Sequence, residues 1–227
     1  MTKWDSLTRP KDQGGLRITN TLTMNECLIV KWIWKLCQGS DELWYKLLQA
    51  KYMHRNNFFL SKNKGVSQFW QGLHQVKHLF QWGALNKIKN GEGTLFWKDI
   101  WMGKVPINLK YPRFFDICRD KDVPVSECYE RGEWNIDLAR PLNDSDCCLW
   151  EELHTELREH NTSQGRDLVF WALDNSSRFT TKSLYRFRTD GGVKTPVYKK
   201  NWNCKVPLKI KVFYGKSTMG KSKRPQC

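Results

Sequence analysis

The chain has 227 residues, of which 40% are hydrophobic and 13% aromatic, enough to build one or two buried cores, so wholesale disorder is not expected. The formal net charge of +15 favours polyanionic partners, because each neutralised phosphate releases counterions. An anionic membrane surface is the weaker alternative. The apolar stretch over residues 27–34 is interrupted by Lys31, and the first residues lack a signal-peptide pattern. We therefore expect an intracellular protein of the nucleus or cytoplasm that is neither secreted nor inserted in a membrane.

Charge divides the chain into three segments. Residues 1–110 carry 17 basic and 7 acidic side chains, residues 111–177 carry 7 and 15, and residues 178–227 carry 14 and 1. We expect a helical and hairpin module over 1–110, an acidic connecting segment with a hairpin and a helix over 111–177, and a strongly basic segment over 178–227. An acidic middle between basic ends fits either intramolecular pairing or two separate anion-binding surfaces.

The first part of the chain has the periodicity of three helices. Residues 23–38 are apolar nearly all round, which predicts a core helix buried on most sides. Ser40 is expected to be the N-cap of a second helix, and Ser67 that of a third whose apolar positions recur every three or four residues. The second helix is expected to bury one stripe, formed by Leu43, Trp44, Leu47 and Leu48.

Further along the chain, short strands alternate with turns. Two antiparallel hairpins are predicted, with strands and turns at residues 85–89, 90–93 and 94–97 for the first and 123–129, 130–132 and 133–136 for the second. A helix capped by Asp144 or Ser145 follows, and then strands over 168–173 and 178–181. The expected fold class is therefore α+β, helix-rich at the N-terminal side with short antiparallel hairpins, and with a basic, helical or partly disordered C-terminal tail.

Residues that carry catalytic chemistry are sparse. Polymerisation uses carboxylates that hold two metal ions, yet the chain contains no Asp-Asp pair, and we expect Asp99 to be a turn or cap residue. His74 and His78 share a helix face, but no neighbouring ligand completes a metal site, which favours a solvated face. The Gly-rich turn 90–93 lacks the Lys-Ser/Thr of a P-loop, which favours a turn over a phosphate cradle. We predict no enzyme activity, no metal and no cofactor.

The basic C-terminal segment interleaves cations with an aromatic side chain, as proteins that bind single strands do. The expected partner is the phosphate backbone of RNA or DNA, because no base-reading residue can be identified. The alternative for this segment is an amphipathic helix with a solvated lysine face and a buried Trp202. The candidate nucleic-acid-binding residues are Arg186, Arg188, Lys199, Lys200, Trp202, Lys205, Lys209 and Lys211.

Several short runs occur in a specific order and spacing along nearly the whole chain. They include Arg9-Pro10-Lys11-Asp12-x-Gly14-Gly15-Leu16-x-Ile18, Lys31-Trp32-x-Trp34-Lys35, Phe96-Trp97-x-Asp99-x-Trp101, Phe179-Thr180-Thr181-Lys182-Ser183 and Val206-Pro207-Leu208-Lys209-Ile210-Lys211. Together they resemble plant non-LTR (LINE-type) retrotransposon reverse transcriptases. The resemblance implies a region downstream of the polymerase domain that runs into a truncated reverse-transcriptase zinc-binding domain.

The chain departs from this family at three places. Arg17 stands where the family tends to have Gly, Tyr214 stands where it tends to have Trp, and the Cys and His ligands expected after Phe213 do not follow. We therefore expect a non-catalytic fragment of a reverse-transcriptase polyprotein with, at most, weak sequence-independent nucleic-acid binding. The alternative is a structural or protein-interaction module without a nucleic-acid role.

Overall fold

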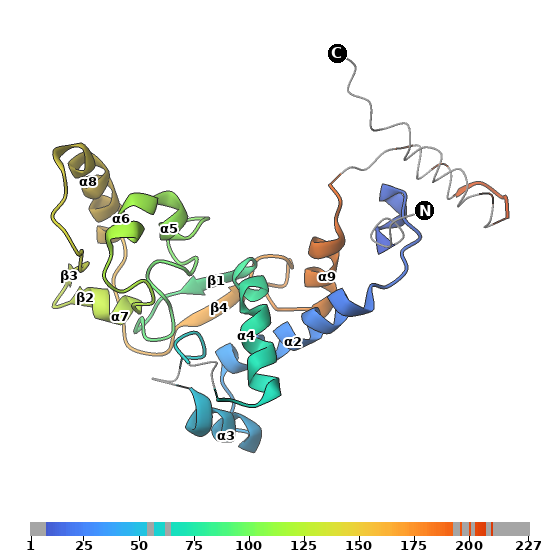
Figure 1. Ribbon diagram of the computed structural model, residues 1–227, viewed down its shortest axis with the longest axis horizontal. Coiled ribbons are helices and arrows are strands. Elements are labelled where there is room, and N and C mark those ends of the chain that lie inside the picture. The colour runs from blue at the N-terminus through green and yellow to red at the C-terminus, as the bar shows by residue number, and fades with distance from the viewer. Residues whose placement is uncertain are drawn as a thin grey trace, which may run out of the picture. The chain divides into compact units, whose positions relative to one another are not determined.

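The structure, a computed structural model, describes residues 8–53, 57–61, 65–192, 196, 200, 203–207 and 210. These residues form an α+β fold, as expected, in which short helices alternate with two antiparallel two-stranded sheets (Figure 1). Two compact units arise: unit 1 comprises Met1–Leu28 and Thr181–Cys227, and unit 2 comprises Ile29–Thr180. Their boundaries differ from those of the three charge segments, which stay a prediction. Among the described residues, no helix is long and apolar enough to cross a membrane.

The first helices follow the expected order, but they bury different residues. Helix α2 (Thr21–Gln38) turns Cys27, Val30, Ile33 and Leu36 inward, while Trp32 on the other side is 37% exposed, so it is not buried all round. Helix α3 (Leu43–Tyr52) begins after Glu42, because the Ser40 hydroxyl accepts the Glu42 N–H ahead of the helix instead of capping it. The stripe predicted for α3 is also wrong, since this helix buries Tyr45 and leaves two of the four predicted positions, Leu43 and Leu47, exposed.

Helix α4 (Gln68–Gln81) confirms the cap predicted at Ser67, whose side chain accepts the N–H of Trp70. Its inward face is the predicted apolar stripe, with Trp70, Leu73 and Phe80 among the buried side chains. An apolar stripe of this kind holds a helix by packing rather than by propensity.

The first predicted hairpin does not form. Strand β1 (Ala84–Lys87) pairs instead with β4 (Leu168–Trp171), in antiparallel register from Ala84 opposite Trp171 to Lys87 opposite Leu168. The two strands lie side by side in Figure 1. Residues 94–97 make no strand, and Phe96 and Trp97 enter the core of unit 2.

The second hairpin is confirmed only at its tip. Strands β2 (Tyr129–Glu130) and β3 (Glu133–Trp134) pair across Arg131 and Gly132, both of which have positive φ, as tight hairpin turns require. The residues before β2 form helix α7 (Val125–Cys128), preceded by the short helices α5 (Ile107–Lys110) and α6 (Pro112–Ile117).

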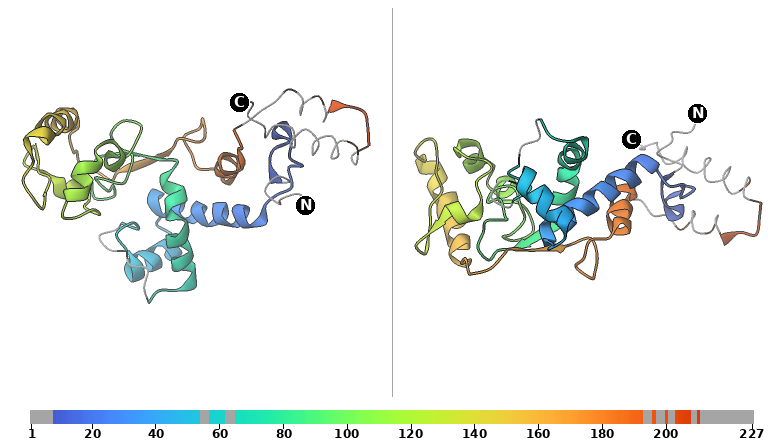
Figure 2. Two further views of the ribbon diagram at one scale, coloured as in Figure 1. Left: turned by 45° about the horizontal axis from the view of Figure 1, so that its top comes forward. Right: turned by 90° about the horizontal axis from the view of Figure 1, so that it is seen from below.

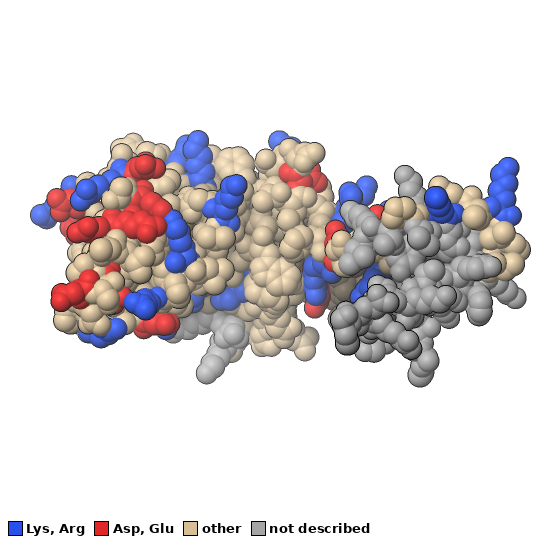
Figure 3. All heavy atoms as spheres, turned by 90° about the horizontal axis from the view of Figure 1, so that it is seen from above, with Lys and Arg blue, Asp and Glu red and all other residues tan. Residues whose placement is uncertain are grey.

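The acidic segment carries helix α8 (Asp144–Arg158), whose N-cap position is occupied by Asn143 without a side-chain cap hydrogen bond, so the cap predicted at Asp144 or Ser145 is wrong. Figure 3 shows acidic side chains gathered at the end of unit 2 that carries α8. Two of them pair locally, because Arg113 of α6 lies 2.9 Å from Asp146 and Lys110 of α5 contacts Glu156.

The strand predicted over 178–181 is absent, because helix α9 (Thr181–Thr189) begins there. The preceding turn forms as expected: the Asp174 carboxylate accepts the N–H of Ser176 and Ser177 takes a positive φ. The predicted basic tail lies mostly outside the described residues.

The core of unit 2 is built around the run 96–101. Trp97 is fully buried and donates its indole N–H to Cys118 Sγ at 3.0 Å, and the indole N–H of Trp101 donates to the Phe96 carbonyl at 2.9 Å. Buried indoles usually find such partners. Asp99 is a turn residue, as expected, and it accepts the Leu95 N–H at 2.8 Å.

Candidate nucleic-acid interface

Unit 1 contains a closed loop whose shape depends on two glycines. The short 3-10 helix η1 (Lys11–Gln13) ends at Gly14, whose φ is +84°, in the left-handed region that favours glycine. Gly15 lies so close to the chain that an added Cβ would come within 2.0 Å of the Arg9 carbonyl oxygen. The Arg17 N–H then donates to that carbonyl at 3.1 Å. The Gly14-Gly15 pair of the family-like run is therefore required by the backbone.

Gln13 fastens this loop to the end of α9. Its side-chain oxygen accepts the Gly191 N–H at 2.6 Å, and its side-chain nitrogen donates to Asp190. The Asn20 N–H donates to the Tyr185 hydroxyl of α9 at 2.9 Å. Segment 8–19 and α9 therefore lie side by side, as Figure 2 shows. Residues almost at opposite ends of the described chain meet here.

A cavity of about 690 Å³ opens between the loop and α9. Four cations line it, Lys11 and Arg17 from the loop and Lys182 and Arg186 from α9, together with two acidic residues. One of these acids, Asp190, already accepts hydrogen bonds from Gln13 and the Gly192 N–H. Lys182 and Arg186 are four residues apart, so both point to the same side of α9. The cavity presents positive charge to an anion.

The structure separates the predicted binding residues. Arg186 lines the cavity, whereas Arg188 forms an ion pair with Glu26 of α2 within unit 1. Lys200 and Lys205 are exposed, and Lys199, Trp202, Lys209 and Lys211 lie outside the described residues. Sequence reasoning missed the other cavity cations. The helical spacing from Arg186 identifies Lys182, but no local pattern places Lys11 or Arg17 beside them.

Unit 2 contains a second anion-attracting arrangement, which its own chain fills. The Asp167 carboxylate accepts the N–H groups of Lys89, Gly91 and Gly93 at 2.7, 3.0 and 3.1 Å, and the Thr94 hydroxyl at 2.8 Å. The Gly-rich turn is therefore a backbone anion nest, of the kind that binds phosphate elsewhere. Because a buried carboxylate occupies it, a phosphate cradle is excluded here.

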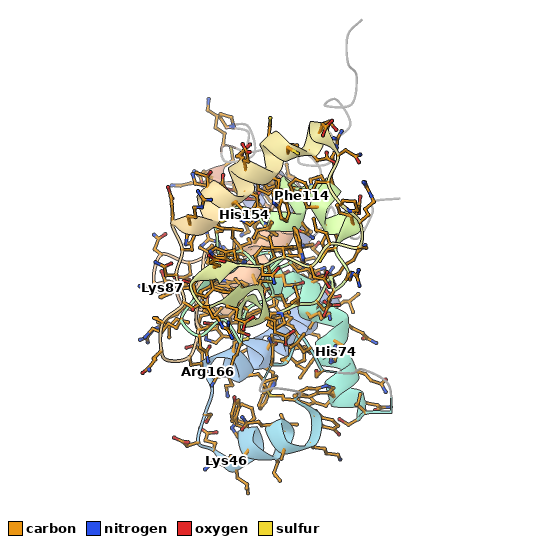
Figure 4. All side chains as sticks on the ribbon, turned by 90° about the vertical axis from the view of Figure 1, so that its left-hand side faces the viewer. Lys46, His74, Lys87, Phe114, His154 and Arg166 are labelled. Atoms are coloured by element: carbon orange, nitrogen blue, oxygen red, sulfur yellow. The ribbon has the colours of Figure 1, made fainter. Side chains whose placement is uncertain are left out.

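Next to this nest lies a smaller cavity of about 250 Å³. Arg166 lines it and donates to the Leu36 carbonyl and the Tyr45 hydroxyl at 3.3 and 3.2 Å. Figure 4 shows Arg166 near α3, with Lys46 on the outer side of that helix. The guanidinium thus serves to join α2, α3 and the start of β4.

The two histidines of α4 have different surroundings. His74 is half-buried, with Nε2 3.1 Å from the Ser61 hydroxyl and its ring against Phe58, and burial lowers its pKa. It is not on a solvated face, whereas His78 is exposed beside Trp82. In the part of the chain that the structure describes, no group of three or more His, Cys, Asp or Glu side chains is placed to hold a metal ion.

Comparison with known proteins gives one similarity. A protein of Arabidopsis thaliana named "Putative ribonuclease H protein" is 28% identical to this chain in an alignment of 229 positions that covers 94% of this chain. The alignment takes in 35% of that protein, so the chain spans about a third of its length. No family model matches the chain, and no solved structure does.

Proposed function

We propose that this chain is a non-catalytic part of a retroelement reverse-transcriptase polyprotein that binds RNA or DNA through its phosphates, without sequence preference. The observation that carries the proposal is the cavity of unit 1, with Lys11, Arg17, Lys182 and Arg186 on its walls. Guanidinium and ammonium groups neutralise phosphates whatever the bases are, and such contacts supply most of non-specific affinity.

Two similarities support the retroelement origin. The Arabidopsis relative has the name of a ribonuclease, which implies a nucleic-acid substrate for that protein. The family-like runs point to plant LINE-type reverse transcriptases, and Gly14 and Gly15 of the first run shape the loop that bears two cavity cations. The absence of enzyme activity is supported by the sequence, because two-metal polymerisation uses closely placed carboxylates and the chain has no adjacent Asp pair.

A salt series tests the binding proposal. If four cations contact phosphates, a plot of log K against log salt should have a slope of about −3.6 for duplex and about −2.8 for single strands. Replacing Lys182 and Arg186 with Ala should flatten the duplex slope by about two units for every sequence tested. Fluorescence anisotropy with labelled oligonucleotides measures both values.

A matched variant replaces two exposed cations of unit 2, Lys104 and Arg131, with Ala, which removes the same charge at residues that do not line the cavity. Its slope should stay closer to that of the wild type. Equal flattening by both double variants would mean that net charge alone attracts the oligonucleotide. Absence of binding at low salt would leave the structural or protein-interaction module as the better account.

A further inference from the structure

Unit 2 carries an exposed group of aromatic rings, which we call the Trp32 platform and define as Trp32 of α2, Trp44 of α3 and Phe69 of α4. The ring of Trp32 stands at right angles to both others, with centroids 5.4 Å from Trp44 and 5.6 Å from Phe69. Three helices therefore place their aromatic side chains around one central indole. Perpendicular ring pairs of this kind are favourable contacts, so the arrangement is held in place.

The platform lies at the surface. Trp32 is 37% exposed and Phe69 is 41% exposed, whereas Trp70, the neighbour of Phe69 on α4, is fully buried. On α3, Leu43 and Leu47 on either side of Trp44 in the sequence are exposed as well, at 73% and 59%. Large apolar groups that gather at a surface mark a place where a partner binds.

The charge around the platform selects the partner. Lys35 Nζ lies 4.8 Å from the centre of the Trp32 ring and 5.8 Å from that of Trp44. The three helical stretches that bear the platform, residues 29–38, 43–52 and 68–81, contain no Asp or Glu, and the acidic side chain that contacts it is Glu42, directly before α3, which accepts a hydrogen bond from the Trp44 indole N–H. They contain five lysines, Lys31, Lys35, Lys46, Lys51 and Lys77. Cations beside exposed aromatic rings match a polyanion whose own rings are accessible.

We propose that the Trp32 platform binds single-stranded nucleic acid by stacking on unpaired bases, with Lys35 near the adjoining phosphates. Every base has a flat aromatic face, so stacking tolerates any sequence but requires bases that are free of a duplex. The platform belongs to unit 2 and shares no residue with the cavity of unit 1. It therefore adds a preference for single strands, which the cavity does not supply, and it does not depend on the proposed function.

The test compares a fluorescein-labelled oligothymidylate with a duplex of the same length, using the full chain. Trp32→Ala should weaken oligothymidylate binding by about 5- to 150-fold, the range for loss of one stacking contact, and should change duplex binding little. Trp32→Phe keeps a ring and should retain most of the affinity, which guards against a variant that fails to fold. Trp82→Ala, at an exposed tryptophan outside the platform, is the matched control and should bind as the wild type does.

Intrinsic fluorescence provides a second readout. Oligothymidylate should quench the tryptophan emission of the wild type, and the quenching should shrink in Trp32→Phe while binding persists. Unchanged single-strand affinity in both Trp32→Ala and Phe69→Ala would overturn the proposal, as would an equal loss of duplex affinity. Self-association that Trp32→Ala abolishes, without oligonucleotide binding, would instead make the platform a protein contact. The Lys182 and Arg186 variants separate the two sites, because they alter the salt slope and leave the Trp32 quenching intact.

Discussion

Two regions of this molecule gather groups that attract an anion, and they differ in what fills them. In unit 2, three backbone N–H groups and the Thr94 hydroxyl converge on Asp167, which is only 6% exposed. In unit 1, four cations line an open cavity together with only two acidic residues. The Gly-rich turn 90–93 thus stabilises the fold of unit 2, whereas segment 8–19 and helix α9 of unit 1 present accessible positive charge.

The largest expected effect on stability comes from removing the Asp167 carboxylate from the backbone anion nest. Asp167→Ala leaves four donors, two of them buried, without this acceptor, so the free energy of unfolding should fall by about 3–5 kcal/mol. Urea denaturation measures this. Asp174→Ala is the control, because Asp174 accepts hydrogen bonds within an exposed turn and its loss should cost about 1 kcal/mol. A loss at Asp167 no larger than at Asp174 would show that the nest does not anchor the fold.

Asp99 sharpens the comparison, because it is a buried carboxylate with fewer donors. It accepts from the Leu95 N–H and from Gln81, and burial raises its pKa from 3.8 to about 6. Since the folded-state pKa is raised, the stabilisation is present at low pH and is lost as pH rises through about 6. From about pH 7 to about pH 4, wild-type stability should rise by about 2 kcal/mol relative to Asp99→Asn. Parallel pH profiles in urea denaturation would contradict this.

The smallest expected effect concerns the open cavity. Arg17 has a φ of +59°, in the region that favours glycine. Arg17→Gly should therefore raise stability by about 1 kcal/mol and flatten the duplex salt slope by about 0.9. Arg17→Ala should flatten the slope equally without the gain in stability. A slope that Arg17→Gly leaves unchanged would remove this residue from the binding surface. At position 17 the chain thus combines backbone strain with a cation.

The sequence correctly predicted those elements that depend on residues close together in the chain. Ser67 caps α4 as predicted, because a hydroxyl three residues before a free N–H determines a helix start. The Arg131-Gly132 turn likewise joins β2 to β3. The hairpin predicted over 85–97 failed because Asp167 and β4, about eighty residues further along, satisfy the donors of β1 and its turn. Strand pairing between such distant residues cannot be predicted from the periodicity of a short stretch of sequence.

The candidate site has the same limitation. The charge pattern predicted that the basic C-terminal segment binds nucleic acid, and Arg186 of that segment does line the cavity. Its partners Lys11 and Arg17 come from the opposite end, and the Gln13–Gly191 hydrogen bond that joins the two spans 178 positions. The sequence also could not predict that Leu43 and Leu47 are exposed, because apolar residues at helical spacing predict burial whether or not a neighbouring element covers them.

The pairing of β1 with β4 also bears on the order in which unit 2 is assembled. Lys87 lies opposite Leu168, so residues 88–167 form one long loop whose two ends are held side by side. During synthesis, β1 leaves the ribosome well before its partner exists, and closing so long a loop is costly in chain entropy. The helices and the short hairpin within 88–167 have their own core and can become ordered first, which brings the ends together. Strand β4 then completes unit 2 by pairing with a strand made about eighty residues earlier.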